Sequence, residues 1–142
     1  MRGVAVDASV WIAAQDPADP FCTRSRLFFS HAVATGILIQ VPAFARVEVA
    51  CALARKLRNP VQGEWLANLV FKTSGAKEQP VNSVLLAKAL ALGTTKFLRG
   101  ADAIYAATAE LVGCSLVSWD KEHLQRAGAL TPDDWLVANP LP

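Results

Sequence analysis

The sequence has too few cysteines, and the wrong pattern of them, for a disulfide-stapled protein. Its 142 residues contain three cysteines, Cys22, Cys51 and Cys114. An odd number of cysteines argues against a disulfide framework, and these three show no metal-ligand spacing. Each lies in an apolar context, so we expect all three to be small core residues.

Long hydrophobic runs are also missing. No apolar stretch approaches the roughly 20 residues that a membrane-spanning helix needs. Near the N-terminus, Asp7 interrupts the first apolar stretch and no secretory cleavage pattern follows, so we expect no signal peptide and a cytoplasmic location. The hydrophobic fraction of 53% and a mean hydropathy of +0.30 instead suit a compact α/β protein. The length predicts a single domain over residues 1–142.

The sequence carries no strong charge of either sign. A net charge of +2 is too small to indicate nucleic-acid binding by itself. The balance changes if four of the 12 acidic residues share one pocket, because the remaining surface would then carry 14 basic and only 8 acidic side chains. A shared acidic pocket would therefore leave a basic exterior.

Hydrophobic periodicity predicts alternating strands and helices. The predicted strands cover residues 3–6, 37–41 and 115–118. The predicted helices begin or run at residues 10–12, 21–35, 43–57, 61–72, 81–92, 102–112 and 121–126, with Gly93 and Gly113 ending two of them. Residues 73–80 are predicted to be a polar connecting loop, and the tail through Trp135 to Pro142 a turn with weak structure.

Three aspartates follow these elements in a recurring arrangement. Asp7 and Asp120 come directly after predicted strands, and Asp102 lies in the first turn of an Ala-rich helix. Functional groups of open α/β sheets gather outside the carboxyl ends of the strands, which makes these acids candidates for a site. The alternative is that each aspartate caps a helix, an interaction that stabilises by about 1 kcal/mol.

Glu48 is the acid that capping does not explain. It is predicted to lie in the middle of helix 43–57, where Phe44, Val47, Val49 and Cys51 surround it. Burying a carboxylate among such side chains is costly unless it is paired or bound to a metal. Partial exposure or an ion pair with Arg55 remains the alternative.

Several carboxylates that converge would repel one another unless a cation joined them. Without cysteine or histidine ligands, the natural occupant is an oxygen-preferring ion such as Mg²⁺ or Mn²⁺. Ions of this kind activate water and stabilise charge on phosphoryl oxygens, which suggests phosphate chemistry.

Four segments, taken together, resemble the PIN-domain ribonucleases, and most closely the VapC toxins of bacterial toxin–antitoxin pairs. The segments are Val4-Ala5-Val6-Asp7-Ala8-Ser9, Val47-Glu48-Val49-Ala50, Asp102-Ala103-Ile104-Tyr105-Ala106-Ala107-Thr108-Ala109 and Leu116-Val117-Ser118-Trp119-Asp120. The resemblance implies a Rossmann-like fold with a central parallel sheet flanked by helices. It further implies an endoribonuclease site dependent on Mg²⁺ or Mn²⁺, homodimerisation, and inhibition by a small VapB-type antitoxin.

The same resemblance assigns roles to individual residues. By position, Asp7, Glu48, Asp102 and Asp120 would be the metal ligands and catalytic acids. Ser9 and Ser118 would orient carboxylates or water, and Glu122 would be an additional acid. His123 stands where the family often has an aromatic residue, and it receives no firm role.

The predicted reaction is hydrolysis of an RNA phosphodiester by metal-activated water. Single-stranded or looped RNA is the more accessible substrate, because the major groove of A-form RNA hides its bases. A second hypothesis is a catalytically silent PIN-like module that binds RNA or protein. Two sets of residues are candidates for RNA contacts, with core packing or solvated surface as the alternative: Trp11, Trp65, Trp119 and Trp135, and Arg46, Arg55, Arg99 and Lys121.

Overall fold

The fold is built on a central sheet of parallel strands. The computed structural model describes residues 2–142. Within them, β1 (Gly3–Val6), β2 (Leu38–Pro42), β3 (Lys77–Gln79) and β4 (Ser115–Val117) form a four-stranded sheet in the order β3-β2-β1-β4. All three strand pairs are parallel. This sheet confirms the predicted α/β class with a central parallel sheet.

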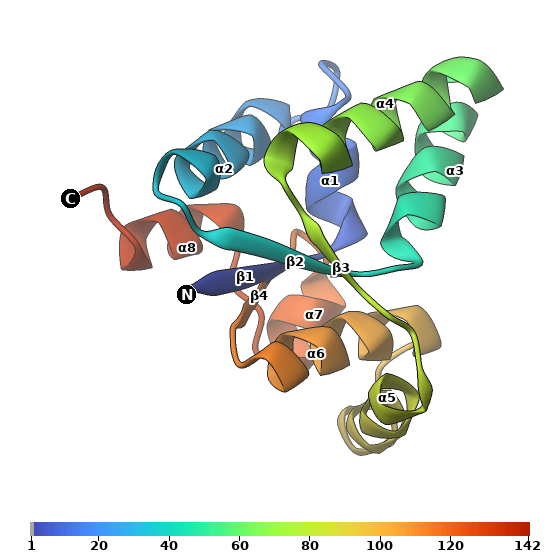
Figure 1. Cartoon of the computed structure of the whole chain (residues 1–142), viewed down its shortest axis with the longest axis vertical. Helices are drawn as coiled ribbons and strands as arrows, with labels where there is room; N and C mark the ends of the chain where they lie inside the picture. The colour runs from blue at the N-terminus through green and yellow to red at the C-terminus, as the bar shows by residue number, and fades with distance from the viewer. Residues whose placement is uncertain (1) are drawn as a thin grey trace.

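Helices cover both faces of the sheet. Residues 2–142 contain α1 (Ala8–Ala14), α2 (Cys22–Ala34), α3 (Ala45–Leu57), α4 (Pro60–Ser74), α5 (Ser83–Lys96), α6 (Gly100–Val112), α7 (Lys121–Arg126) and α8 (Pro132–Ala138). Figure 1 shows α1 to α4 on one side of the strands and α5, α6 and α7 on the other. Within residues 2–142, no helix is both long enough and apolar enough to cross a bilayer.

The core lies where the two helical layers meet the central strands. Val4, Val6, Ile39 and Val41 on β1 and β2 are almost fully buried, because helices cover both of their faces. On one side Trp11 is fully buried and stacks on aromatic rings from α2 and α4. This packing fixes the carboxyl ends of β1 and β4, from which the candidate site is built.

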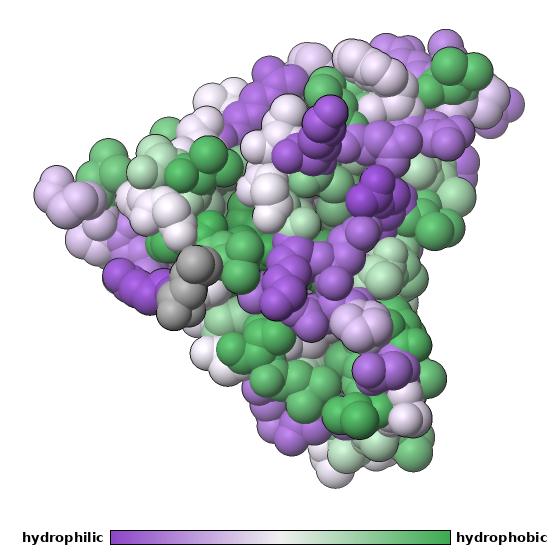
Figure 2. All heavy atoms as spheres, viewed as in Figure 1, coloured by the Kyte–Doolittle hydropathy of each residue, from purple (hydrophilic) through white to green (hydrophobic). Residues whose placement is uncertain are grey.

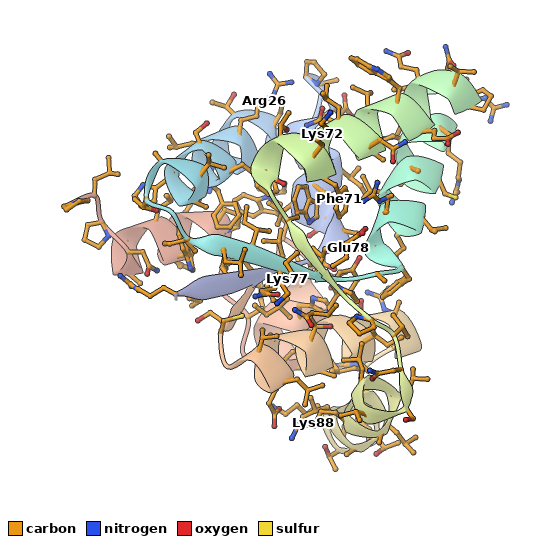
Figure 3. All side chains as sticks on the ribbon, in the orientation of Figure 1. Arg26, Phe71, Lys72, Lys77, Glu78 and Lys88 are labelled. Carbon is orange, nitrogen blue, oxygen red and sulfur yellow. The ribbon has the colours of Figure 1, made fainter. Side chains whose placement is uncertain are left out.

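Two segments that the sequence predicts as a loop or as weak structure contain regular elements instead. The loop predicted over residues 73–80 contains β3, whose Lys77 and Glu78 are exposed at the edge of the sheet (Figure 3). A short charged strand is typical of a sheet edge and lacks the apolar pattern of a buried strand. The tail predicted as weak structure forms α8, where the side chain of Thr131 accepts a hydrogen bond from the Asp134 N–H and Trp135 is buried.

One glycine lies inside a helix instead of ending it. The predicted helix 81–92 continues to Lys96, and Gly93 lies within it. A Cβ at Gly93 would come within 2.9 Å of the Ala103 Cβ, so glycine allows α5 to pack closely on α6. The absent side chain therefore serves helix packing.

Cys51 is also placed differently from the prediction. It is exposed on α3, whereas Cys22 is buried and Cys114 half-buried.

The space-filling view shows hydrophilic side chains across the middle of the face and hydrophobic ones gathered over α5 in its lower part (Figure 2).

Candidate functional site

The candidate site lies beyond the carboxyl ends of two neighbouring strands, β1 and β4. In their register Val6 pairs with Val117, and the Asp7 N–H continues the ladder by donating to the Val117 carbonyl at 3.0 Å. From β1 the chain passes to β2 on one side, while β4 lies on the other. Such a change of direction is where open α/β sheets place their ligands.

Asp7 is 6% exposed and has two functions, one for each oxygen. Its Oδ2 accepts hydrogen bonds from the Ser9 N–H, at 3.3 Å, and from the Ser118 hydroxyl, at 2.9 Å. The Ser9 contact confirms that Asp7 caps α1. Its Oδ1 lies 3.8 Å from Nδ1 of His123. Capping therefore leaves one oxygen directed at the site.

The two serines join the loops that follow β1 and β4. Ser118 is fully buried, and its Oγ accepts a hydrogen bond from the Asp120 N–H at 2.9 Å. The Ser9 hydroxyl accepts one from the Trp119 N–H at 3.0 Å. These contacts hold Asp7 and Asp120 in a fixed relation.

Asp102 lies in the first turn of α6, as predicted, but it does not cap the helix. The helix begins at Gly100, so Arg99 occupies the cap position and the capping interpretation is wrong for Asp102. Its Oδ1 lies 3.0 Å from Nε2 of His123, and its Oδ2 lies 2.7 Å from Nε of Arg99. Asp102 is 9% exposed, and its carboxylate is shared between a buried contact with His123 and a contact with the exposed Arg99.

His123 is the site residue that sequence reasoning missed. It is fully buried on α7, and neither ring nitrogen has an aligned hydrogen-bond partner among residues 2–142. Asp7, Asp102 and His123 each offer one potential metal-ligand atom, and these three atoms lie within 4.8 Å of one another. The sequence holds one indication that His123 belongs to the site, because it follows Asp120 by three residues at the start of the same helix.

Glu48 reaches the site from α3, in a different position from the predicted one. The helix begins at Ala45, so Glu48 lies in its first turn and not at its middle. It is half-buried, and its Oε1 accepts a hydrogen bond from the Tyr105 hydroxyl at 2.8 Å. Among residues 2–142 no ion pair joins Glu48 to Arg55, so the predicted ion pair is wrong, whereas the partial exposure named as the other alternative is observed.

The surroundings of Glu48 favour its protonated form. Burial raises the pKa of the Glu48 carboxyl, and the negative charges of Asp7 and Asp102 raise it further, against the opposing hydrogen bond from Tyr105. Burial likewise raises the pKa of the Tyr105 hydroxyl, as does the adjacent Glu48. Glu48 therefore belongs electrostatically to the same cluster as Asp7 and Asp102.

Asp120 and Glu122 join the cluster through Arg99. Asp120 caps α7, because its Oδ1 accepts from the Glu122 N–H at 2.8 Å, and its Oδ2 lies 2.9 Å from Nη2 of Arg99. Nε of Arg99 lies 3.1 Å from Oε2 of Glu122. Although burial raises the pKa of Asp120, the Glu122 N–H and Arg99 lower it overall. Asp120 is thus an ionised member on the outer side of the site.

The donor set of Asp7, Asp102 and His123 fits a divalent cation. Two buried carboxylates this close repel each other unless a positive charge joins them. Nδ1 of His123 is buried and lies 3.8 Å from Oδ1 of Asp7, too far for a hydrogen bond, which is costly unless a ligand satisfies it. Carboxylate oxygens suit Mg²⁺ and Mn²⁺, and an imidazole nitrogen suits transition metals.

The aromatic and basic residues predicted as candidates for RNA contacts lie in different parts of the molecule. Trp11 and Trp135 are buried in the core, and Trp119 is half-buried and stacks on Phe21. Trp65 is 60% exposed on α4. Of the basic candidates, Arg99 touches the acidic cluster directly.

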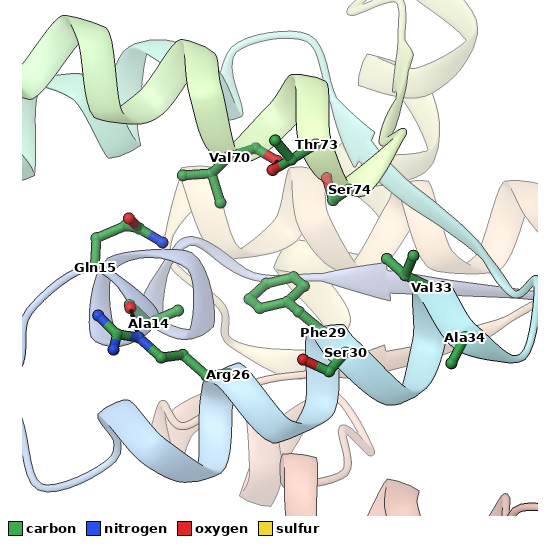
Figure 4. A pocket seen from close by; sticks show the side chains of 10 residues that line it. All are labelled: Ala14, Gln15, Arg26, Phe29, Ser30, Val33, Ala34, Val70, Thr73 and Ser74. Carbon is green, nitrogen blue, oxygen red and sulfur yellow. Dashed lines mark hydrogen bonds between the residues drawn. The ribbon is translucent and has the colours of Figure 1, made fainter.

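A hollow lies between α1, α2 and α4, apart from the acids. Figure 4 shows Phe29 and Val70 facing it, with Arg26 at one end. The Arg26 Nε donates to the Ala14 carbonyl at 2.7 Å. The side chains that line this hollow include no carboxylate, so it is distinct from the candidate site.

Comparison with known proteins assigns the chain to a family. The model of the PIN domain matches residues 4–130, which is most of the sequence, and the chain belongs to the PIN domain family. No curated protein matches the sequence significantly.

Solved structures share the fold at low sequence identity. PAE2754 from Pyrobaculum aerophilum is 22% identical with a TM-score of 0.71, over 96% of this chain and 88% of that one. The sarcin–ricin-loop-cleaving toxin VapC20 from Mycobacterium tuberculosis is 16% identical with a TM-score of 0.74, over 89% and 96%. A toxin–antitoxin complex from Klebsiella pneumoniae is 18% identical with a TM-score of 0.69, over 91% and 97%.

Proposed function

We propose that this protein is a metal-dependent endoribonuclease and the toxin of a VapBC-type toxin–antitoxin pair. One observation carries the proposal, namely the convergence of Asp7 and Asp102 on the buried ring of His123. A structural role alone does not require two carboxylates and an imidazole to meet in a nearly dry position. Membership of the PIN domain family adds support.

The ligands of the proposed ion are Asp7, Asp102 and His123, with Asp120 as an additional acid. A divalent cation bound there would polarise a phosphoryl oxygen and lower the pKa of a coordinated water. Because one ligand is an imidazole nitrogen, we expect Mn²⁺ to bind more tightly than Mg²⁺, which prefers oxygen donors.

Glu48 is the proposed base for the attacking water. Its raised pKa brings its carboxylate nearer to the operating pH, which favours proton transfer. In the proposed hydrolysis the water oxygen bonds to phosphorus and the ester P–O bond breaks. One proton passes to Glu48, and the leaving oxygen takes a proton from solvent. Tyr105 orients Glu48 through its hydrogen bond.

The proposed partners are an RNA substrate, a VapB-type antitoxin and a second copy of the chain in a homodimer. The similar structure of VapC20 is that of an RNA-cleaving toxin, and the one from Klebsiella pneumoniae is a complex with an antitoxin. An RNA target is in keeping with a cytoplasmic location, and residues 1–142 are proposed to act as one domain.

The test is metal binding followed by cleavage, for the wild type, Asp102→Asn and His123→Phe. Millimolar Mn²⁺ should raise the melting temperature of the wild type by several degrees, because a ligand at a hundred times its dissociation constant stabilises by about 2.7 kcal/mol. Both variants should lose most of that rise, and Asp102→Asn should lose metal-dependent RNA cleavage.

The control is Asp134→Asn, which removes an exposed carboxylate at α8, away from the site. It should keep the response to Mn²⁺. A fully active Asp102→Asn protein would contradict the assignment. If Mn²⁺ does not change the melting temperature of the wild type, the result would favour the catalytically silent binding module.

A further inference from the structure

Among residues 2–142, Arg99 is the one basic side chain that contacts three acids of the candidate site. Its guanidinium reaches Asp102 at 2.7 Å, Asp120 at 2.9 Å and Glu122 at 3.1 Å. Despite these contacts the side chain is 63% exposed, so it covers the site from the solvent side. Hydrogen bonding to Asp102 raises the pKa of the Arg99 guanidinium, which stays charged.

Arg99 binds one oxygen of Asp102 and one oxygen of Asp120, while the other oxygen of each carboxylate makes a contact inside the protein. On Asp102 it binds Oδ2, while Oδ1 faces His123. On Asp120 it binds Oδ2, while Oδ1 accepts from the Glu122 N–H. Both oxygens of Asp120 therefore already have a donor. Asp120 gains an oxygen for a metal ion when Arg99 moves away.

The guanidinium also has donors to spare. Of its nitrogens, Nε and Nη2 donate to carboxylates, and Nη1 has no acceptor within residues 2–142. A planar guanidinium matches the two oxygens of a phosphate, and its exposed position lets a nucleic-acid strand reach it. Exposed ion pairs contribute little stability each, so exchanging a carboxylate for a phosphate is not opposed by a large energy.

We propose that Arg99 is a phosphate-binding residue that covers the acidic site until a divalent cation and a nucleic-acid strand replace its contacts. In the free protein it neutralises Asp102, Asp120 and Glu122. With the cation bound, the carboxylates no longer need it, and it pairs with a backbone phosphate of the substrate. This inference rests on the proposed function, since it assumes a metal ion and a phosphodiester strand.

The first measurement is Mn²⁺ affinity by titration calorimetry, without nucleic acid, for the wild type, Arg99→Gln and Arg99→Lys. Arg126→Gln is the control, because Arg126 is also exposed and lies 3.5 Å from Glu122, but it contacts neither Asp102 nor Asp120. Arg99→Gln should bind Mn²⁺ several-fold more tightly than the wild type, because a competing cation is gone. If Arg99 were only a structural tie, its loss would weaken Mn²⁺ binding.

The second measurement is affinity for a phosphorothioate-linked single-stranded RNA of mixed sequence, which resists hydrolysis, in the presence of Mn²⁺. Arg99→Gln should weaken this binding roughly tenfold, since a charge-assisted phosphate contact is lost. Arg99→Lys keeps the charge and should recover part of the affinity. Arg126→Gln should change it little.

Each outcome decides between the two proposals. If the wild type binds Mn²⁺ and RNA, and Arg99→Gln behaves like Arg126→Gln, the role of Arg99 is overturned and the proposed function stands. If the wild type binds no Mn²⁺, the proposed function fails and this inference fails with it. Should Arg99→Gln not fold, Arg99→Ala takes its place, and an Arg99→Ala protein with wild-type affinity for RNA and Mn²⁺ would overturn the role.

Discussion

At the scale of single residues, each carboxylate of the site is divided between two tasks. Asp7 caps α1 with one oxygen and turns the other to His123. Asp120 caps α7 and also holds Arg99. The sequence alone presented capping and function as alternatives, whereas the geometry makes them compatible. A cap fixes the carboxylate in place without using all of its lone pairs.

Glu48 gives a pH-dependent prediction for the protein in EDTA. Its pKa is raised on folding, so its contribution to stability is fully present below the pKa of the unfolded chain and is lost as the pH rises through the folded value. Glu48→Gln, which keeps an acceptor for Tyr105, should therefore be more stable than the wild type at neutral pH. The difference should vanish at acid pH.

Chemical denaturation across this pH range measures the effect. The control is Glu64→Gln, the same substitution at an exposed position of α4, and its difference from the wild type should not change with pH. A constant offset for Glu48→Gln would contradict the prediction.

The sequence predicted those site residues that follow a strand. Asp7 and Asp120 follow strands, so their positions could be anticipated. His123 could not be assigned, because its role depends on α7 packing its ring between Asp7 and Asp102, from distant parts of the chain. Periodicity describes neighbours along one element and gives no information on such contacts.

At the scale of elements, close helix packing depends on two glycines within helices, Gly93 in α5 and Gly63 in α4. Gly63 lies in α4, where a Cβ would come within 2.6 Å of the Ala54 backbone nitrogen on α3. Helix α3 carries Glu48, so this close approach also supports the site.

Gly63→Ala should destabilise the protein by about 1–3 kcal/mol, because the added methyl forces α3 and α4 apart. Gly100→Ala is the matched control, since nothing lies within 4 Å of a Cβ there and alanine favours the helix. Thermal unfolding of both variants in EDTA measures the difference. Equal melting temperatures would show that the two helices can separate without cost.

The elements that the sequence predicted wrongly share a cause. β3 is a three-residue strand at an exposed edge and α8 has only seven residues, so hydrophobic patterning carries little signal for either. The start of α8 was still readable from Thr131 and Pro132, a capping residue followed by proline at the first helical position. Nothing comparable marks Lys77–Gln79 as a strand.

At the scale of the whole molecule, the acids are concentrated and the bases are spread. Five of the 12 acidic residues lie at the candidate site, namely Asp7, Glu48, Asp102, Asp120 and Glu122. The rest of the chain then has seven acids against 13 lysines and arginines, once Arg99 is counted with the site. Outside the candidate site, basic side chains therefore outnumber acidic ones even though the net charge is only +2.

Binding of single-stranded RNA should therefore depend strongly on salt. With three or more phosphate contacts, affinity should fall roughly tenfold or more between about 50 and 200 mM salt. Fluorescence anisotropy with the Asp102→Asn variant measures binding without turnover. An oligonucleotide with uncharged methylphosphonate linkages is the control and should bind weakly at every salt concentration. Salt-independent binding of the charged RNA would contradict a basic exterior.

The contact between Ser118 and Asp7 joins residues 111 positions apart in the chain. A ribosome synthesises Asp7 early but reaches Asp102, Ser118 and His123 only after residue 100. The nascent protein therefore carries a half-built centre for most of its synthesis. On the proposed function, the chain cannot cleave RNA until α7, which follows the last strand of the sheet, has been synthesised.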